Sequence, residues 1–271
     1  MTSRLLSLQV PIFKYFRVYP SMPFEKPGRP RRFAPLQPEK GRASDAPKLQ
    51  GIVFDVDGTL CEPQTYMFKE MRGALGIPKS VDILEHIYSL PTLEQQNNAM
   101  KAIQEIEGRA MLAQKPQAGL VELMQYLDSR GVQKGICTRN FDKPVSHLIT
   151  KFLNGHVFHP IITREFRPPK PDPAGILHIA QSWALSDGGT GLIMVGDSMD
   201  DMTAGYRAGA ATVLLVNEVN AHLAKHEHTD LCITRLDELI PILEDGFVGE
   251  IDQGEENPDT RSQAESALER K

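Results

Sequence analysis

Residues 51–60 read Gly-Ile-Val-Phe-Asp-Val-Asp-Gly-Thr-Leu, and this stretch limits the possible folds most strongly. The four residues up to Phe54 predict a strand buried on both faces, as in an open parallel sheet. Asp55 and Asp57 follow at once, where such sheets bind their ligands. Two carboxylates at this spacing repel each other unless a cation relieves them, which indicates Mg²⁺. A turn or a helix cap is the less favoured alternative for the two acids taken alone.

Composition narrows the class of protein. The 271 residues suffice for one sizeable domain and a smaller one. With 41% hydrophobic and 24% charged residues, the composition is ordinary for a soluble globular protein. The formal net charge of −5 and the lack of a basic stripe give no indication of nucleic-acid binding. No run of about 18 apolar residues occurs, so we expect no membrane-spanning helix.

Cysteine usage and the two ends of the chain bear on localisation. Three cysteines without a CxxC spacing favour free thiols in a reducing, intracellular compartment. Residues 1–49 hold eight prolines and ten Lys or Arg against three Asp or Glu. Such a segment is typical of a mitochondrial presequence or of a disordered basic tail, so the cytoplasm and the mitochondrion both stay open. Residues 245–271 are rich in Asp and Glu and predict a disordered acidic tail.

Residues 63–117 predict a small helical lobe. From residue 91 to 113 the apolar side chains recur with a period close to 3.6 among Glu, Gln and Lys. Breaks at residues 76–78 and 89–91 contain proline and divide the stretch. We therefore expect three or four short helices, separate from the rest of the chain.

Residues 118–244 alternate between helix and strand patterns. Strands are predicted within residues 132–137, 157–162, 192–195, 211–216 and 231–233, and helices at 119–129, 145–152, 173–183, 199–209 and 236–243. This alternation predicts βαβ units and a parallel sheet. The fold class is therefore α/β, with a Rossmann-like core formed by residues 50–62 and 118–244 and an all-helical cap inserted after the first strand.

Right-handed crossovers bring the carboxyl ends of all these strands to one rim of the sheet. Asp55 and Asp57, Thr138 and Asp197 each follow a predicted strand, and Lys170 lies in a proline-rich loop before a helix. We expect these side chains to converge on one site.

Their chemistry suits phosphoryl transfer. Asp55 can attack phosphorus and form an aspartyl-phosphate, and Asp57 can protonate the leaving oxygen and then activate water. Thr138 can donate a hydrogen bond to phosphate, and Lys170 adds positive charge that also keeps Asp55 ionised. Beside these groups, Asp197 and Asp201 stand four residues apart and can hold Mg²⁺ together with Asp55.

Four motifs in order and at sensible spacing carry a family resemblance: Asp55-Val56-Asp57-Gly58-Thr59, Ile136-Cys137-Thr138, Lys170-Pro171-Asp172-Pro173 and Gly196-Asp197-Ser198-Met199-Asp200-Asp201. Through them, the chain resembles the haloacid dehalogenase-like (HAD) hydrolase superfamily over residues 50–243. The pattern is most similar to phosphoglycolate phosphatase-like members.

The resemblance implies a role for each motif residue. Asp55 would be the nucleophile and a metal ligand, and Asp57 the acid/base, with its main-chain carbonyl also on the metal. Thr138 and Lys170 would bind phosphate. The last motif would supply the remaining metal ligands, Asp197 and, in preference to Asp200, Asp201.

Arg139, next to Thr138, is a further candidate phosphate-binding residue. A surface salt bridge explains an arginine at this position equally well, so both interpretations stay open at this point.

The spacing between the motif residues predicts where in the sequence the cap is inserted. Asp55 and Thr138 are 83 residues apart, which leaves room for a helical lobe, whereas only 32 residues lead from Thr138 to Lys170. The cap therefore follows the first strand, and caps of this kind close over small phosphorylated metabolites and exclude water.

The predicted function is Mg²⁺-dependent hydrolysis of a phosphoric monoester, either a sugar phosphate or a phosphoglycolate-like acid. Asp57 argues against a dehalogenase, which needs no proton for its leaving group. A sugar phosphomutase of the same fold keeps both aspartates and remains an alternative, as does a catalytically silent binding protein. The expected partner is the small substrate, with no nucleic acid and no membrane, and the chain is expected to be a monomer or a homodimer.

Overall fold

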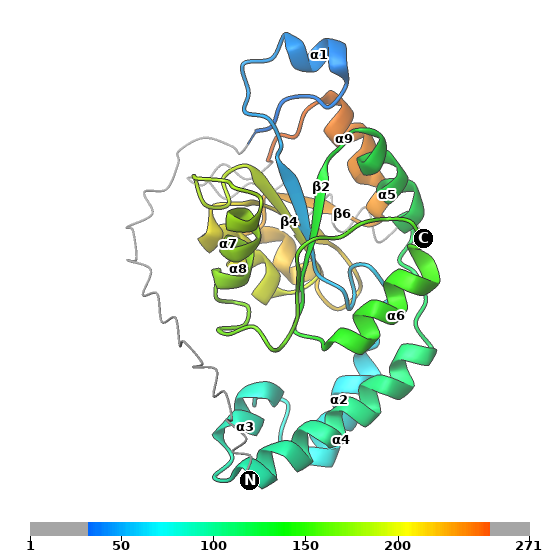
Figure 1. The fold of residues 1–271 in the computed structure, drawn as a ribbon, viewed down its shortest axis with the longest axis vertical. Helices are drawn as coiled ribbons and strands as arrows, with labels where there is room; N and C mark the ends of the chain where they lie inside the picture. Colours follow the sequence, from blue (N-terminus) through cyan, green and yellow to red (C-terminus); the bar gives the residue numbers. More distant parts are fainter. Residues whose placement is uncertain (1–31, 250–271) are drawn as a thin grey trace, which may run out of the picture.

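The computed structural model describes residues 32–249. Its centre is a six-stranded sheet in which all neighbouring strands are parallel, in the order β3-β2-β1-β4-β5-β6 (Figure 1). The strands are β1 (Gly51–Phe54), β2 (Gln133–Cys137), β3 (Ile161–Ile162), β4 (Leu192–Gly196), β5 (Ala211–Leu215) and β6 (Leu231–Ile233). The predicted α/β fold with a parallel sheet is confirmed, and β1 lies at its centre.

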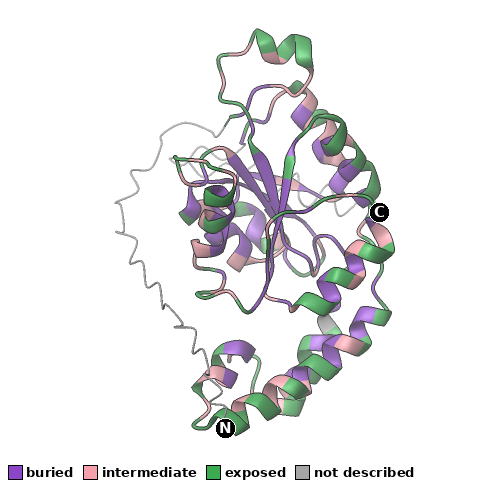
Figure 2. Ribbon diagram, in the orientation of Figure 1, coloured by how far each residue is buried: buried purple, intermediate pink, exposed green. Residues whose placement is uncertain are grey.

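Helices cover both faces of the sheet, because consecutive side chains of a strand point to opposite faces. Ile52 and Phe54 of β1 pack into one apolar cluster with helices α5 (Leu120–Ser129), α6 (Asp142–Phe152) and α9 (Leu239–Asp245). Val53 packs into the other cluster with α7 (Ala174–Ser182) and α8 (Met199–Ala208). Figure 2 shows the resulting buried sheet between partly exposed helices. Two short 3₁₀ helices, η1 (Ala221–Lys225) and η2 (Leu236–Glu238), complete the core.

The insertion after β1 forms a helical lobe of α2 (Thr65–Leu75), α3 (Ile83–Ser89) and α4 (Leu93–Leu112), which lies below the sheet in Figure 1. Its helices share an apolar cluster of their own. Asp82 caps α3, and a capping box between Thr92 and Gln95 begins α4. The helical lobe is confirmed, but the expectation of short helices is wrong for α4, whose 20 residues have no internal break.

Residues 32–49 correct the expectation that the whole stretch 1–49 lies outside the fold. Phe33 is only 3% exposed, and its ring packs against that of Phe247 with centroids 5.8 Å apart. Main-chain hydrogen bonds link Phe33 to Phe247 and Leu36 to Leu243, and the short helix α1 (Pro38–Arg42) follows. The fold also continues through Phe247, beyond the boundary predicted at residue 245. The presequence and tail predictions otherwise concern residues 1–31 and 250–271, outside the described residues.

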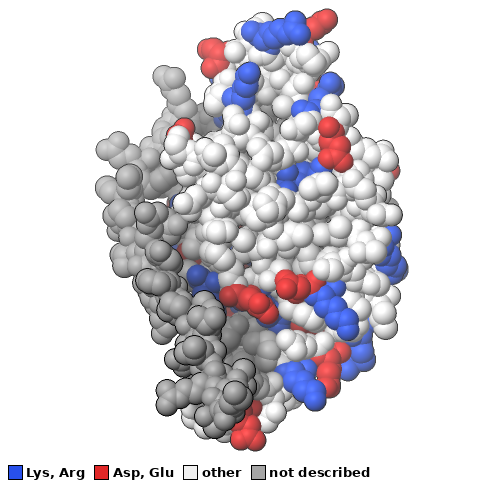
Figure 3. Space-filling view, viewed as in Figure 1, with Lys and Arg blue, Asp and Glu red and all other residues white. Residues whose placement is uncertain are grey.

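The distribution of charged side chains on the surface is consistent with the small net charge of the chain. On the face shown in Figure 3, acidic and basic side chains of the described residues are interspersed. Within residues 32–249, no helix is long and apolar enough to cross a membrane.

Phe33→Ala tests whether the proline-rich segment belongs to the folded core. Removing a buried phenyl ring leaves a cavity, so we expect the free energy of unfolding to fall by about 3 kcal/mol in a denaturant titration. Lys40→Ala is the control, since it removes only an exposed ion pair to Asp245 and should cost less than about 1 kcal/mol. Equal, small losses in both variants would mean that the segment packs only loosely on the core.

Candidate functional site

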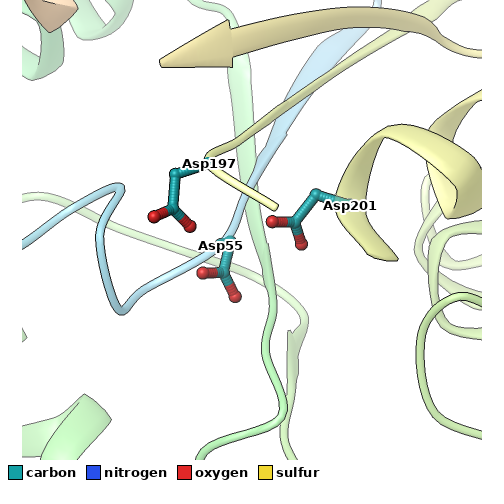
Figure 4. Close-up of side chains that lie close together, drawn as sticks. All are labelled: Asp55, Asp197 and Asp201. Atoms are coloured by element: carbon teal, nitrogen blue, oxygen red, sulfur yellow. The ribbon is translucent and has the colours of Figure 1, made fainter. Parts of the chain in front are cut away.

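Three carboxylates converge where β1 and β4 end (Figure 4). Asp55 follows β1, Asp197 follows β4, and Asp201 lies in the first turn of α8. The strands are hydrogen-bonded neighbours with Phe54 opposite Val195, so Asp55 lies beside Gly196, the residue before Asp197. One carboxylate oxygen from each aspartate lies within 4.8 Å of the other two. The structure thus brings together three of the predicted metal ligands.

Local geometry fixes Asp201 in this cluster. Ser198 begins α8, and its hydroxyl donates to Asp201 Oδ2 at 2.6 Å, as does its main-chain N–H at 3.0 Å. Oδ1 therefore turns toward Lys170, which donates to it. Gly196 leaves the room for this arrangement, because a Cβ there would collide with the Asp201 side chain. Gly58, with φ of +84°, likewise leaves room for the carboxylate of Asp197.

Lys170 holds two of the carboxylates. Its buried ammonium donates to Asp55 Oδ1 at 2.7 Å and to Asp201 Oδ1. Burial alone would lower the pKa of Lys170, but the negative charges of Asp201 and Asp55 raise it above its usual range. Lys170 is therefore charged at neutral pH.

One lysine does not balance three carboxylates. Burial raises the pKa of Asp55 to about 7, with Lys170 opposing this shift and Asp201 adding to it. Burial and the charges of Asp201 and Asp55 raise the pKa of Asp197 to about 8. With all three carboxylates ionised, the cluster would therefore carry more negative charge than its surroundings compensate. An oxygen-only ligand set with excess negative charge fits a hard divalent cation such as Mg²⁺.

Asp57 is oriented by Asn140, a residue that the sequence analysis missed. The Asn140 carboxamide accepts from the Phe141 N–H at 2.8 Å, so its amino group faces Asp57 and donates to Oδ2 at 2.7 Å. Burial raises the pKa of Asp57, and this hydrogen bond opposes the shift. Its position two residues after Thr138, just beyond the end of a strand, is a signal from which Asn140 could have been predicted.

Thr138 lies beside these groups at the end of β2. It is 5% exposed, and its hydroxyl accepts from the main-chain N–H of Asn140 at 3.1 Å. Its own proton stays available for a ligand in the cavity that Thr138, Asp55 and Lys170 line.

Arg139 is held by carboxylates. Its guanidinium pairs with Asp82 at the start of α3 and with Asp200 in α8, so it links the helical lobe to the core. This is the salt-bridge alternative left open for Arg139, and its charge is committed to these partners. Asp200 is thereby turned to Arg139, while Asp201 is the residue in the carboxylate cluster.

A cavity of about 280 Å³ lies between the carboxylate cluster and the helical lobe. A second ion pair crosses from lobe to core at its wall, between Glu107 of α4 and Arg164, both at most 5% exposed. Burial raises the pKa of Glu107 to about 7, against the opposing charge of Arg164. This volume is just below the range of pockets for drug-sized ligands, so the cavity suits a small metabolite.

Comparisons with known proteins agree with this geometry. A family model described as haloacid dehalogenase-like hydrolase matches residues 49–209. An uncharacterized hydrolase of Saccharomyces cerevisiae is 46% identical over 199 residues, which cover 72% of this chain and 90% of the yeast protein. Phosphoglycolate phosphatase 1 of Pseudomonas aeruginosa is 28% identical over 125 residues, 45% of each chain.

The fold has counterparts among solved structures. The crystal structure of a predicted phosphoglycolate phosphatase from Haemophilus somnus superposes with a TM-score of 0.56 at 19% identity, covering 72% of this chain and 97% of that one. At this identity the similarity concerns the fold alone.

The excess charge predicts a pH-dependent effect of Asp197→Asn on stability. A carboxyl whose pKa is raised on folding, here from 3.8 to about 8, stabilises the fold at low pH and loses that contribution as pH rises through this window. We therefore expect the Tm of the metal-free variant, relative to the native protein, to rise from pH 5 to about pH 8. Excess Mg²⁺ should raise the Tm of the native protein at pH 8 and leave that of the variant unchanged.

Thermal unfolding with and without Mg²⁺ measures both effects. Asp45→Asn, which changes an exposed carboxylate, is the control and should show neither. A Mg²⁺-dependent rise in Tm that survives in Asp197→Asn would contradict the assignment of the cluster as the metal site.

Proposed function

The chain belongs to the haloacid dehalogenase-like hydrolase family, and we propose that it is a phosphatase that hydrolyses the monoester of a small metabolite. The observation that carries the proposal is the second carboxyl group, Asp57, held by Asn140 in the same cavity as Asp55. An oxygen leaving group needs a proton, whereas a halide does not. A carboxyl whose pKa is raised by desolvation is a suitable proton donor.

In the first step, a carboxylate oxygen of Asp55 attacks phosphorus. A phosphorus–oxygen bond to Asp55 forms, the ester bond breaks, and Asp57 gives its proton to the departing oxygen. In the second step, Asp57 takes a proton from water as the water oxygen attacks phosphorus. Inorganic phosphate leaves, and Asp55 is regenerated as a carboxylate.

Positive charge and hydrogen bonds bind the phosphate. Lys170 sits against Asp55 and neutralises both the nucleophile and the incoming group, and the Thr138 hydroxyl donates to a phosphate oxygen. Bound by Asp55, Asp197, Asp201 and the main-chain carbonyl of Asp57, Mg²⁺ would supply the remaining charge neutralisation.

The small cavity supports a small leaving group. The name of one relative, phosphoglycolate phosphatase 1 of Pseudomonas aeruginosa, agrees with a short phosphorylated acid. A phosphomutase would use the same two aspartates, so net phosphate release without a bisphosphate activator separates the two functions.

Phosphate release from a panel of small phosphate esters tests the proposal. We expect turnover that requires Mg²⁺ and falls at least about a thousandfold in Asp55→Asn, which keeps the shape of the nucleophile but removes its charge. Asp45→Asn is the matched control and should keep full activity. Release from no ester by a folded native protein would overturn the phosphatase proposal.

Asp57→Asn tests the role of the second carboxyl group through its dependence on the leaving group. A general acid matters most for poor leaving groups, so kcat should fall by about 100-fold or more for alkyl phosphates. For 2,4-dinitrophenyl phosphate, whose phenolate leaves without a proton, the fall in the rate of the first step should be much smaller. An equal fall for both esters in single-turnover measurements would mean that Asp57 does not protonate the leaving group.

A further inference from the structure

Four cationic side chains line the cavity, and three of them are paired with carboxylates. Lys170 is held by Asp55 and Asp201, as described above. The two core arginines, Arg139 and Arg164, are each paired with a carboxylate of the helical lobe. The fourth is Arg72 of α2, which has no carboxylate partner among residues 32–249.

Arg72 is nevertheless set into the cavity wall. It lines the cavity with Phe68, one turn earlier on the same face of α2, and with the adjacent Met71. Its Nε is buried without a hydrogen-bond partner, and Nη1 has only a long contact of 3.4 Å to the main-chain oxygen of Phe68. Arg72 as a whole is of intermediate exposure, and no carboxylate of residues 32–249 forms an ion pair with it.

A guanidinium in this position is suited to an anion that arrives with the ligand. Burying polar N–H groups without partners is costly, and a planar guanidinium binds carboxylate or phosphate oxygens through paired hydrogen bonds. The transferred phosphate already has Lys170 and Thr138 on the core side. Arg72 lies on the lobe side of the same cavity, where the leaving group must lie.

We propose that Arg72 determines specificity by selecting phosphate monoesters whose leaving group carries a second anionic group, a carboxylate or a second phosphate. The inference rests on the proposed phosphatase function and narrows its substrate class. A neutral polyol phosphate would leave the guanidinium without a counter-charge. The size of the cavity limits the leaving group to a short chain.

Matched esters test this assignment. In the first pair, 3-phosphoglycerate carries a carboxylate where glycerol 3-phosphate carries a neutral hydroxymethyl group. In the second pair, 1,3-propanediol bisphosphate carries a second phosphate where its monophosphate carries a neutral hydroxyl group. The native protein should prefer the anionic member of one pair by about tenfold or more in kcat/KM, as expected for a hydrogen bond to a charged group. The preferred pair distinguishes the carboxylate from the second phosphate.

Three variants test the role of Arg72 in this preference. Arg72→Gln should abolish the preference by lowering kcat/KM for the anionic ester alone, and Arg72→Lys should retain part of it. Arg109→Gln, which removes a cap arginine paired with Glu70 on the exposed surface, should keep the native preference.

The outcomes separate the two proposals. Turnover without discrimination by the native protein, or equal losses on both members of a pair in Arg72→Gln, would overturn the role of Arg72 and leave the phosphatase function standing. A lack of turnover on every ester, 2,4-dinitrophenyl phosphate included, would overturn both.

Discussion

The site depends on a charge imbalance at the centre of the sheet, where the ammonium of Lys170 contacts Asp55 and Asp201 while Asp197 lies beside them. Parallel strands cause the convergence, because β1 and β4 are neighbours and both end here. Glycines at the strand ends leave the space that the carboxylates occupy. Burial, together with the neighbouring carboxylates, raises the pKa values of Asp55 and Asp197. A cluster that is costly to ionise in this way favours a divalent cation, and then the phosphate that the cation and lysine attract together.

The helical lobe supplies the other half of the cavity and is tied to the core by arginines that follow β2 and β3. Arg139 reaches Asp82, and Arg164 reaches Glu107. The Arg164–Glu107 pair is buried, whereas the Arg139–Asp82 pair is about a third exposed. Buried ion pairs contribute little net stability, since desolvation offsets their attraction, and partly exposed ones contribute little because solvent screens them. These pairs therefore orient the lobe over the site more than they stabilise the protein. The carboxylates of Asp82 and Glu107 neutralise these two arginines. Arg72 has no such partner among residues 32–249, so its charge is available to a ligand.

Local patterns were enough to predict the sheet, the helical insertion and the convergence of Asp55, Asp197 and Lys170. Strands such as β4 are continuous apolar runs, and the residues after them are fixed by topology. The segment at Phe33 was missed because its proline-rich composition gives no sign of the Phe247 ring that covers it. The partners of Asn140 and of Arg139 could not be predicted from local patterns, since these contacts span more than 50 residues of sequence.

The central claim is that Asp55 carries the phosphoryl group, and chemical trapping measures this directly. Acid quenching during turnover of the preferred ester, followed by borohydride reduction, converts an aspartyl-phosphate to homoserine, which peptide mass spectrometry locates. We predict homoserine at position 55, dependent on both ester and Mg²⁺. Homoserine at position 57, or unmodified aspartate at both positions while phosphate is released in a burst, would contradict the covalent mechanism.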